Sequence, residues 1–240
     1  MTPERPKSFR FYHFCRGSML LVFRLFHRAK FVNPDNVPTS GACLLVANHQ
    51  SFYDPPLIGS RIRQRPLTFL ARASLFDSKL LGGLISRLNA LPIRDNEGDI
   101  KAIRDIIERL KKGEAVLIFP EGSRTFDGAM VPFRQGAALI IRKAKCPVIP
   151  VAVEGVFDAW PRKKKGPGFG KRMMVMYGEP IAHEELGKDI NDRIEREIDD
   201  MRLELRAELR RMTGGSYPAP GPGDHVFGSL EADSSSSALG

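Results

Sequence analysis

The sequence predicts an α/β protein with a mainly parallel central sheet that is flanked by helices. Short apolar runs alternate with helical patterns between residues 41 and 178, and this alternation is typical of a parallel sheet with helices on both faces. Most of the short runs carry Val, Ile and Leu at consecutive positions, as strands covered on both faces do. With 240 residues, 42% of them hydrophobic, the chain is long enough for one sizeable core.

The first expected element is an amphipathic helix over residues 9–30. Its basic residues and its Phe and Leu side chains fall on opposite arcs of a helical wheel, which is typical of a helix that lies in a membrane interface. A helix packed on the core with its basic face in solvent fits equally well, and the sequence leaves both open. The uninterrupted apolar stretch, residues 17–23, is far shorter than the roughly 20 residues of a membrane span. The basic arc consists of Arg10, His13, Arg16, Arg24, His27 and Arg28.

The rest of the chain is expected to form strands and helices in turn. Residues 99–112 predict a helix with Asp99 as its N-cap and Gly113 as its stop, and residues 135–145 predict another. Residues 184–212 carry apolar side chains at steps of three or four, which predicts a long amphipathic helix packed on the core. The expected strands are residues 43–47, 67–71, 90–93, 115–119, 148–153 and 173–177.

Three parts of the chain follow from these elements. Residues 1–32 are expected to associate with a membrane, residues 33–212 to form the main domain, and residues 213–240, rich in Gly, Ser and Pro, to be a disordered tail. The three cysteines are an odd number without metal-type spacing, which favours reduced thiols.

The charge of the chain indicates an anionic partner. The formal net charge is +9, and residues 1–30 hold seven Lys or Arg against one Glu. A lipid surface, an acidic carrier or nucleic acid would suit such a basic end, but the sequence has no zinc-finger spacing or aromatic-rich RNA motif. At roughly 1 kcal/mol per basic residue, we expect peripheral and salt-sensitive attachment to an anionic membrane, and no nucleic-acid partner.

An imidazole and a carboxylate follow the apolar run 43–47 directly. His49 precedes Asp54 by five residues, so the carboxylate can fix the tautomer of the ring while its other nitrogen takes a proton from an alcohol. Asp54 is followed by two prolines, and Asp as N-cap before Pro is a common helix start. We therefore expect Asp54 to be both the helix cap and the residue that orients His49.

A second polar segment follows the apolar run 115–119. Its Gly122 allows the backbone to approach an anion, and Arg124 offers a two-pronged fork for phosphate oxygens. Glu121 is expected to orient Arg124 or to accept a substrate hydroxyl, and Arg94, after another apolar run, is a second candidate phosphate ligand. Because ligands of open α/β sheets bind beyond the carboxyl ends of strands, both segments should share one crevice. They predict an enzyme that acts on a phosphorylated alcohol.

Together these segments resemble the lysophospholipid acyltransferase family, in which lysophosphatidic acid acyltransferases are the best-known members. The first block of that family, Asn-His-x4-Asp, is matched by Asn48, His49 and Asp54. Its third block, Phe-Pro-Glu-Gly-Ser/Thr-Arg, is matched at every position by residues 119–124. The resemblance covers residues 30–180 in all.

Three further segments are similar to the family. An apolar strand that contains proline and ends in arginine is its second block, and residues 91–94 resemble it, with Leu91-Pro92 where many members have other apolar residues. Residues 133–136 are similar to a Phe-Lys-x-Gly segment, and residues 148–151 are similar to the fourth block, an apolar stretch around a proline.

The resemblance implies an acyltransferase domain over residues 33–212. The acyl group would pass from acyl-CoA or an acyl carrier protein to the free hydroxyl of a lysophospholipid, with lysophosphatidic acid as the default acceptor and phosphatidic acid as the product. No metal and no cofactor beyond the acyl donor is expected, and the location would be the cytoplasmic face of a membrane, peripheral or monotopic. The expected catalytic residues are His49 and Asp54, and the expected phosphate-binding residues are Glu121, Gly122, Ser123, Arg124 and Arg94.

The residues favour a mechanism without an acyl-enzyme. His49 would act as a general base while the hydroxyl attacks the thioester carbonyl, and Asp54 would stabilise the imidazolium, so no nucleophile of the protein is required. The acceptor stays open between lysophosphatidic acid, glycerol 3-phosphate, other lysophospholipids and lyso-ornithine lipid. A non-enzymatic basic protein leaves the His–Asp pair unexplained, and one His with scattered carboxylates makes a poor ligand set for a metal-dependent hydrolase.

Overall fold

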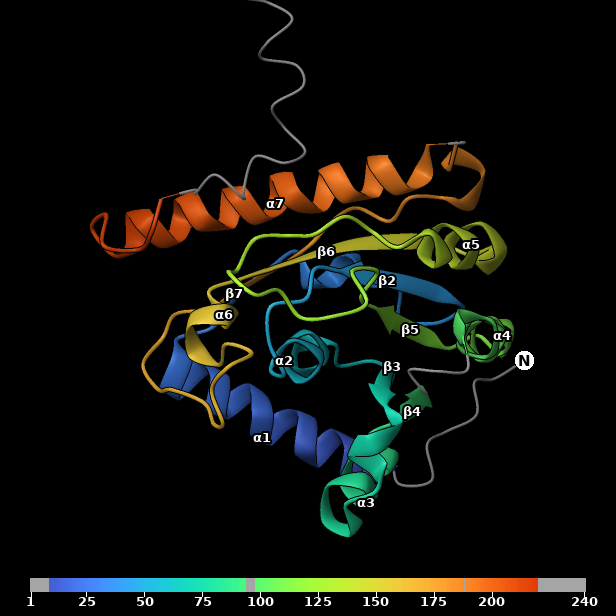
Figure 1. Ribbon diagram of the computed structural model, residues 1–240, viewed down its shortest axis with the longest axis horizontal. Coiled ribbons are helices and arrows are strands. Elements are labelled where there is room, and N and C mark those ends of the chain that lie inside the picture. The colour runs from blue at the N-terminus through green and yellow to red at the C-terminus, as the bar shows by residue number, and fades with distance from the viewer. Residues whose placement is uncertain (1–8, 94–97, 188, 220–240) are drawn as a thin grey trace, which may run out of the picture.

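The computed structural model describes residues 9–93, 98–187 and 189–219, and its centre is a sheet with helices on both faces (Figure 1). In the described residues the sheet has seven strands in the order β1-β7-β6-β2-β5-β3-β4. Neighbouring strands pair in parallel except β6 and β7, which are antiparallel. The predicted fold class is confirmed. The strands are β1 Lys30–Val32, β2 Cys43–Ala47, β3 Leu67–Arg72, β4 Ala90–Ile93, β5 Ala115–Ile118, β6 Val148–Glu154 and β7 Met174–Tyr177.

Six of these strands lie where the apolar runs predict them, with ends that differ by at most one residue. The sequence did not reveal β1, because a strand of three residues is too short to give an apolar run. Lys30 pairs with Met174 and Val32 with Met176, so residues 30–32 belong to the sheet and not to the separate segment 1–32 that we expected.

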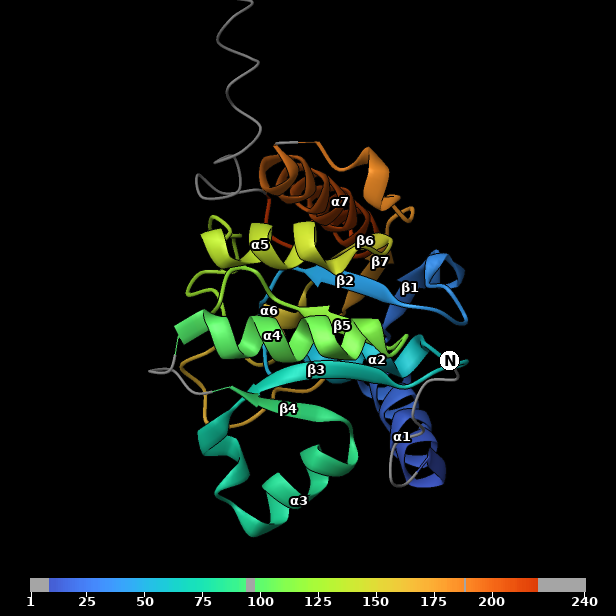
Figure 2. The ribbon, with the colours of Figure 1, turned by 90° about the vertical axis from the view of Figure 1, so that its right-hand side faces the viewer.

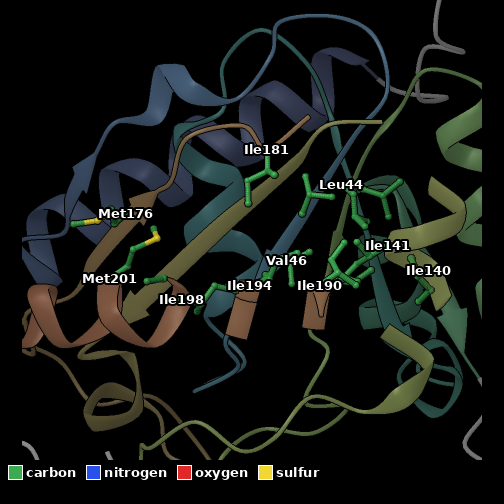
Figure 3. Packing of buried hydrophobic residues seen from close by; sticks show 14 of the residues in the cluster. Leu44, Val46, Ile140, Ile141, Met176, Ile181, Ile190, Ile194, Ile198 and Met201 are labelled. Carbon is green, nitrogen blue, oxygen red and sulfur yellow. The ribbon is translucent and has the colours of Figure 1, made fainter. Parts of the chain in front are cut away.

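Successive residues of the inner strands supply two hydrophobic cores, one on each face of the sheet. In β2, Leu44 and Val46 face a core that contains side chains of α4, α5 and α7 (Figure 3). Leu45 and Ala47 face a second core that contains side chains of α1, α2 and α6. Figures 1 and 2 show α7 and α1 on opposite sides of the sheet. The α-helices are α1 Phe9–His27, α2 Asp54–Arg61, α3 Lys79–Arg87, α4 Gly98–Lys111, α5 Gln135–Ala144, α6 Val156–Ala159 and α7 Ile190–Met212.

Helix α1 packs on the core, with one edge of its basic arc turned toward the protein and part of its apolar arc left exposed. One edge of the basic arc packs against the protein: Arg16 Nη1 donates to Ser60 O at 2.8 Å, and His27 Nδ1 lies 3.1 Å from Lys171 O. A backbone carbonyl binds each of these two nitrogens, which offsets part of the cost of burying them. Part of the apolar arc therefore faces outward. The exposed large side chains of α1 are Phe9, Phe14, Leu21, Leu25 and Phe26.

Two predicted helix starts are wrong. α7 begins at Ile190, because residues 183–185 form a 3₁₀ turn and Gly187, a poor helix former, follows it. α4 begins at Gly98, so Asp99 belongs to its first turn and is not the N-cap. No described helix has the length and apolar character that crossing a bilayer requires.

The predicted tail also begins too early. Residues 213–219 turn back along α7, where Thr213 Oγ1 donates to Leu209 O at 2.8 Å and Tyr217 OH donates to Glu154 Oε1 at 2.9 Å. A buried carboxylate thus fixes a segment whose composition suggested disorder. The rest of the predicted tail, 220–240, and residues 1–8 lie outside the described residues.

Candidate active site

The predicted pair forms a direct hydrogen bond at the carboxyl end of β2. His49 Nδ1 lies 2.8 Å from Asp54 Oδ2, and the His49 side chain is 19% exposed while Asp54 is buried. The imidazole stacks on Phe119, with ring centroids 4.0 Å apart. Because Asp54 and Phe119 fix one edge and one face of the ring, Nε2 is the atom of His49 that remains for a substrate.

The carboxylate of Asp54 orients the loop and does not cap the helix. Tyr53 is the N-cap, and the residues after Asp54 are prolines without an N–H group. The carboxylate instead accepts from Gln50 N at 2.6 Å and Ser51 N at 2.7 Å. Our expectation of a cap was therefore wrong. Burial raises the pKa of Asp54, while its hydrogen bonds with His49, Ser51 and Gln50 oppose that shift.

Two side chains of the same loop tie it to β6. Asn48 Nδ2 donates to Val153 O at 3.0 Å, and Val153 N donates to Asn48 Oδ1 at 2.8 Å. Gln50 Nε2 donates to Glu154 Oε2 and to Gly128 O, each at 3.0 Å. Sequence reasoning did not identify Gln50 as a functional residue, because its partners are 78 and 104 residues away.

The second predicted segment lies beside the first because β2 and β5 are neighbours. The register pairs Val46 with Ile118, so the loops that follow begin level with each other. His49 N donates to Glu121 Oε1 at 2.6 Å, and Thr125 N donates to His49 O at 2.9 Å. The backbone of His49 is thus held on both sides by the segment that carries Arg124.

Glu121 does not orient Arg124 directly, which was one of the two roles we expected; the other, accepting a substrate hydroxyl, stays a prediction. Besides His49 N, it accepts a hydrogen bond from Val131 N at 3.2 Å, and it is buried, with 3% of its surface exposed. It binds two backbone amides, and its carboxyl does not contact Arg124. Burial raises the pKa of Glu121 to about 8.

Gly122 is required by the turn itself. Its φ is +71°, and a Cβ atom at this position would lie 2.3 Å from Arg134 Nε. Its amide donates to Phe119 O at 3.0 Å, so this N–H is not available for an anion, contrary to our expectation. Ser123 is half-buried between Gly122 and Arg124.

Arg124 has an unused hydrogen-bonding group. Its Cζ lies 3.5 Å from the centroid of Phe52, and its buried Nη1 has no hydrogen-bond partner among the described residues. Burial and the charges of Arg162 and Arg72 lower the pKa of Arg124. A half-buried guanidinium with an unpaired donor is suited to an anion. Arg94, the other candidate ligand, lies outside the described residues.

The sheet thus presents a His–Asp pair beside an arginine-bearing turn, the arrangement that the predicted acyl transfer requires. Residues 28–154 match the family model described as "Acyltransferase", and the chain belongs to this family. The predicted resemblance is thereby confirmed, and the protein is an acyltransferase.

Individual relatives agree with this assignment. The chain is 30% identical over 171 residues to 1-acyl-sn-glycerol-3-phosphate acyltransferase of Bacillus subtilis, which covers 71% of this chain and 82% of that protein. It is 30% identical over 205 residues to the Streptococcus pneumoniae enzyme of the same name, an alignment that covers 84% of this chain and 73% of that enzyme. It is 37% identical over 121 residues to lyso-ornithine lipid O-acyltransferase of Pseudomonas aeruginosa, an alignment that covers 48% of this chain and 46% of that protein.

A solved structure has the same fold. The 1-acyl-sn-glycerophosphate (LPA) acyltransferase PlsC from Thermotoga maritima aligns with a TM-score of 0.67 and 24% identity, covering 82% of this chain and 78% of that one.

The buried carboxyl of Glu121 predicts a pH-dependent stability. The pKa of about 8 in the folded protein exceeds the ordinary glutamate value of 4.5. Between these two pH values the folded protein therefore keeps a proton that the unfolded chain has released. Stability should therefore fall as the pH rises from 5 to 8, by up to about 1.4 kcal/mol per pH unit. Glu121→Gln removes this titration.

Chemical denaturation of the wild type and of Glu121→Gln at pH 5.5 and pH 8 measures the effect. We expect the wild type to have the larger free energy of unfolding at pH 5.5. The difference between the two proteins should be smaller at pH 8. A difference in free energy of unfolding that is the same at both pH values would contradict the raised pKa of Glu121.

Proposed function

We propose that this acyltransferase moves a fatty acyl group from a thioester, acyl-CoA or acyl carrier protein, to the free hydroxyl of lysophosphatidic acid, which gives phosphatidic acid. The observation that carries the proposal is the His49–Asp54 pair beside Arg124, whose Nη1 has no partner among the described residues. A base for a hydroxyl and a site for a phosphate are what this acceptor requires. The Bacillus and Streptococcus relatives, both named 1-acyl-sn-glycerol-3-phosphate acyltransferase, support it.

In the proposed reaction His49 Nε2 takes the proton of the acceptor hydroxyl as the oxygen attacks the thioester carbonyl. The tetrahedral intermediate then collapses, the carbon–sulfur bond breaks, and the imidazolium returns its proton to the leaving thiolate. The carboxylate of Asp54 holds the proton on Nδ1 and stabilises the imidazolium. No acyl-enzyme is needed, and Ser51 is buried with its hydroxyl donating to Trp160 O at 3.0 Å.

The phosphate of the acceptor would bind Arg124, with Ser123 next to it. A bidentate arginine–phosphate pair fixes direction as well as distance, so the headgroup positions the hydroxyl near His49. Arg94 stays a predicted second ligand from the end of β4.

A second acceptor class deserves a test because of one relative. The Pseudomonas protein is named for lyso-ornithine lipid, although it aligns over 46% of its length. The unpaired cation Arg124 favours a phosphate monoester over a zwitterionic amino-acid headgroup. Lysophosphatidic acid is therefore our first choice.

A mass-spectrometric screen of acceptors tests the assignment. The protein is incubated on vesicles with acyl-CoA or acyl carrier protein and equal amounts of lysophosphatidic acid, glycerol 3-phosphate, lysophosphatidylethanolamine and lyso-ornithine lipid. We expect phosphatidic acid to dominate the products, and dominance of any other product would overturn the choice of acceptor.

We further propose peripheral attachment to the cytoplasmic face of an anionic membrane through α1. Its outward side chains Phe14, Leu21 and Leu25 are 71%, 58% and 66% exposed, and Arg10, Arg24 and Arg28 are exposed on the same helix or directly after it. Apolar residues flanked by arginines suit the boundary between acyl chains and anionic headgroups.

Helix α3 extends the proposed membrane surface. Leu80 is 87% exposed and Leu84 is 40% exposed, and Figures 1 and 2 show α3 next to β4, the edge strand of the sheet. Helices α1 and α3 meet where the guanidinium of Arg87 lies 5.9 Å from the ring centroid of Phe11.

Two negative charges placed on the exposed apolar side of α1 test the attachment. We expect Leu21→Glu with Leu25→Glu to lower co-sedimentation with phosphatidylglycerol vesicles by about tenfold or more, because two inserted apolar side chains are lost. The matched control is Leu139→Glu on α5, a residue that is 42% exposed. Equal partition of the double variant and the control would contradict the role of α1.

A further inference from the structure

A basic loop after α6 is docked on the loop that carries His49 and Asp54. Trp160 O accepts a hydrogen bond from Ser51 Oγ at 3.0 Å, and the Trp160 ring lies 5.3 Å from the Phe52 ring and 5.2 Å from the Tyr53 ring, between centroids. Trp160 Nε1 also donates to Lys164 O at 3.1 Å, which closes the loop on itself. Residues 160–164 are therefore fixed beside the site.

Within this loop Arg162 contacts the turn that carries Arg124. Its Nη1 donates to Arg124 O at 3.1 Å, and its Cζ lies 4.4 Å from the centroid of Phe126. Arg162 is half-buried, whereas Lys163 and Lys164 beside it are exposed. The backbone carbonyl and the aromatic ring hold its guanidinium at the turn.

Two guanidinium groups at one turn carry more positive charge than the nearby Asp54 offsets. Neither Arg124 nor Arg162 forms an ion pair with a described carboxylate, and the charge of Arg162 contributes to the lowered pKa of Arg124. The nearby Glu121 binds backbone amides instead. Like charges held together in a partly desolvated place repel each other, and a doubly charged anion between them removes that repulsion.

We propose that Arg162 forms, together with Arg124, the binding site for the phosphate monoester of the acceptor, so that the loop 160–164 is part of the acceptor site. The inference rests on the proposed function and names a further ligand for the same phosphate. Arg162 lies outside residues 28–154 that match the family model, and it belongs to none of the sequence blocks that suggested the family.

The arrangement also gives the enzyme a means of selecting its acceptor. Arg162 uses one N–H group to donate to Arg124 O, and its other N–H groups can donate to phosphate oxygens. A dianionic headgroup engages both arginines, whereas a neutral lysolipid gains nothing from Arg162. Removing the charge of Arg162 should therefore weaken phosphorylated acceptors selectively.

The test compares Arg162→Gln with the control Lys163→Gln, which removes the same charge from the exposed neighbour. We expect Arg162→Gln to raise the KM for lysophosphatidic acid by about 10–100-fold, the usual effect of losing a charged hydrogen bond. Its kcat and its KM for acyl-CoA should stay within about twofold of wild type. Lys163→Gln should match the wild type throughout.

Other results would overturn the inference. An unchanged KM for lysophosphatidic acid would show that Arg162 does not bind its phosphate, and a raised KM for acyl-CoA alone would assign the arginine to the donor's phosphate. A purely structural role would lower transfer to monoacylglycerol as much as transfer to lysophosphatidic acid. Arg162→Lys, which keeps the charge, should recover part of the affinity.

Failure of this inference can be told apart from failure of the proposed function. If the wild type does not acylate lysophosphatidic acid at all, the proposed acceptor is wrong. If the wild type does so and Arg162→Gln equals it, only the role of Arg162 is wrong.

Discussion

Replacing His49 with alanine is expected to lower kcat for acyl transfer by about 10²–10⁴-fold, the usual contribution of a general base. A substrate hydroxyl is a weak nucleophile, and in the proposed mechanism the free edge of the His49 ring takes its proton. The opposite edge is already bound to Asp54 Oδ2 at 2.8 Å. Steady-state kinetics with saturating acyl-CoA and lysophosphatidic acid measures the loss.

The fold should survive this substitution. The side chain of His49 makes one hydrogen bond, to Asp54, and one ring contact, with Phe119, while its backbone bonds to Glu121 and Thr125 persist in alanine. We expect an unchanged circular dichroism spectrum and unchanged vesicle binding. A folded His49→Ala protein with wild-type kcat would refute the assignment of the base.

Asp54→Asn is expected to lower both activity and stability. The amide can still accept from the loop, but the negative charge that stabilises the imidazolium is lost, and kcat should fall by about 10²–10⁴-fold. The new NH₂ group would lie where Oδ1 now has no partner among the described residues. A buried unsatisfied donor costs about 1–3 kcal/mol.

Urea denaturation and steady-state kinetics of Asp54→Asn measure the two effects. Asp200→Asn, which changes an exposed residue of α7, is the matched control and should equal the wild type in both. Full activity of Asp54→Asn would mean that the carboxylate does not assist His49.

The sequence predicted the sheet well because buried parallel strands have a strong signature. Runs such as residues 43–47 and 115–118 are apolar at every position, and both strands are buried along their whole length. The strand β1 left no such signature, because its three residues are held by pairing with β7 and not by their own apolar character.

The orientation of α1 shows what a helical wheel omits. A wheel assumes that basic residues face solvent, but Ser60 O and Lys171 O offer acceptors to Arg16 and His27 on the packed side. These acceptors come from residues 44 and 144 positions away. Only the tertiary structure reveals them, and they turn part of the apolar side of the helix outward.

The position of the candidate site was predictable from the sequence. The carboxyl ends of β2 and β5 meet because these strands are neighbours in register, so His49 and Arg124 were expected in one place. The partners of Glu121 and Gln50 were not predictable, since each depends on the path of a loop. Gln50 reaches Glu154, a buried residue that also binds Arg206 and Tyr217.

The most direct test of the central claim is the formation of phosphatidic acid by the purified protein on vesicles that contain lysophosphatidic acid and acyl-CoA. The product is measured by mass spectrometry for the wild type and for His49→Ala side by side. We predict that the wild type forms phosphatidic acid and that His49→Ala forms it at least about 100-fold more slowly. Equal rates of formation by the two proteins would contradict the claim that His49 is the base of a lipid acyl transfer.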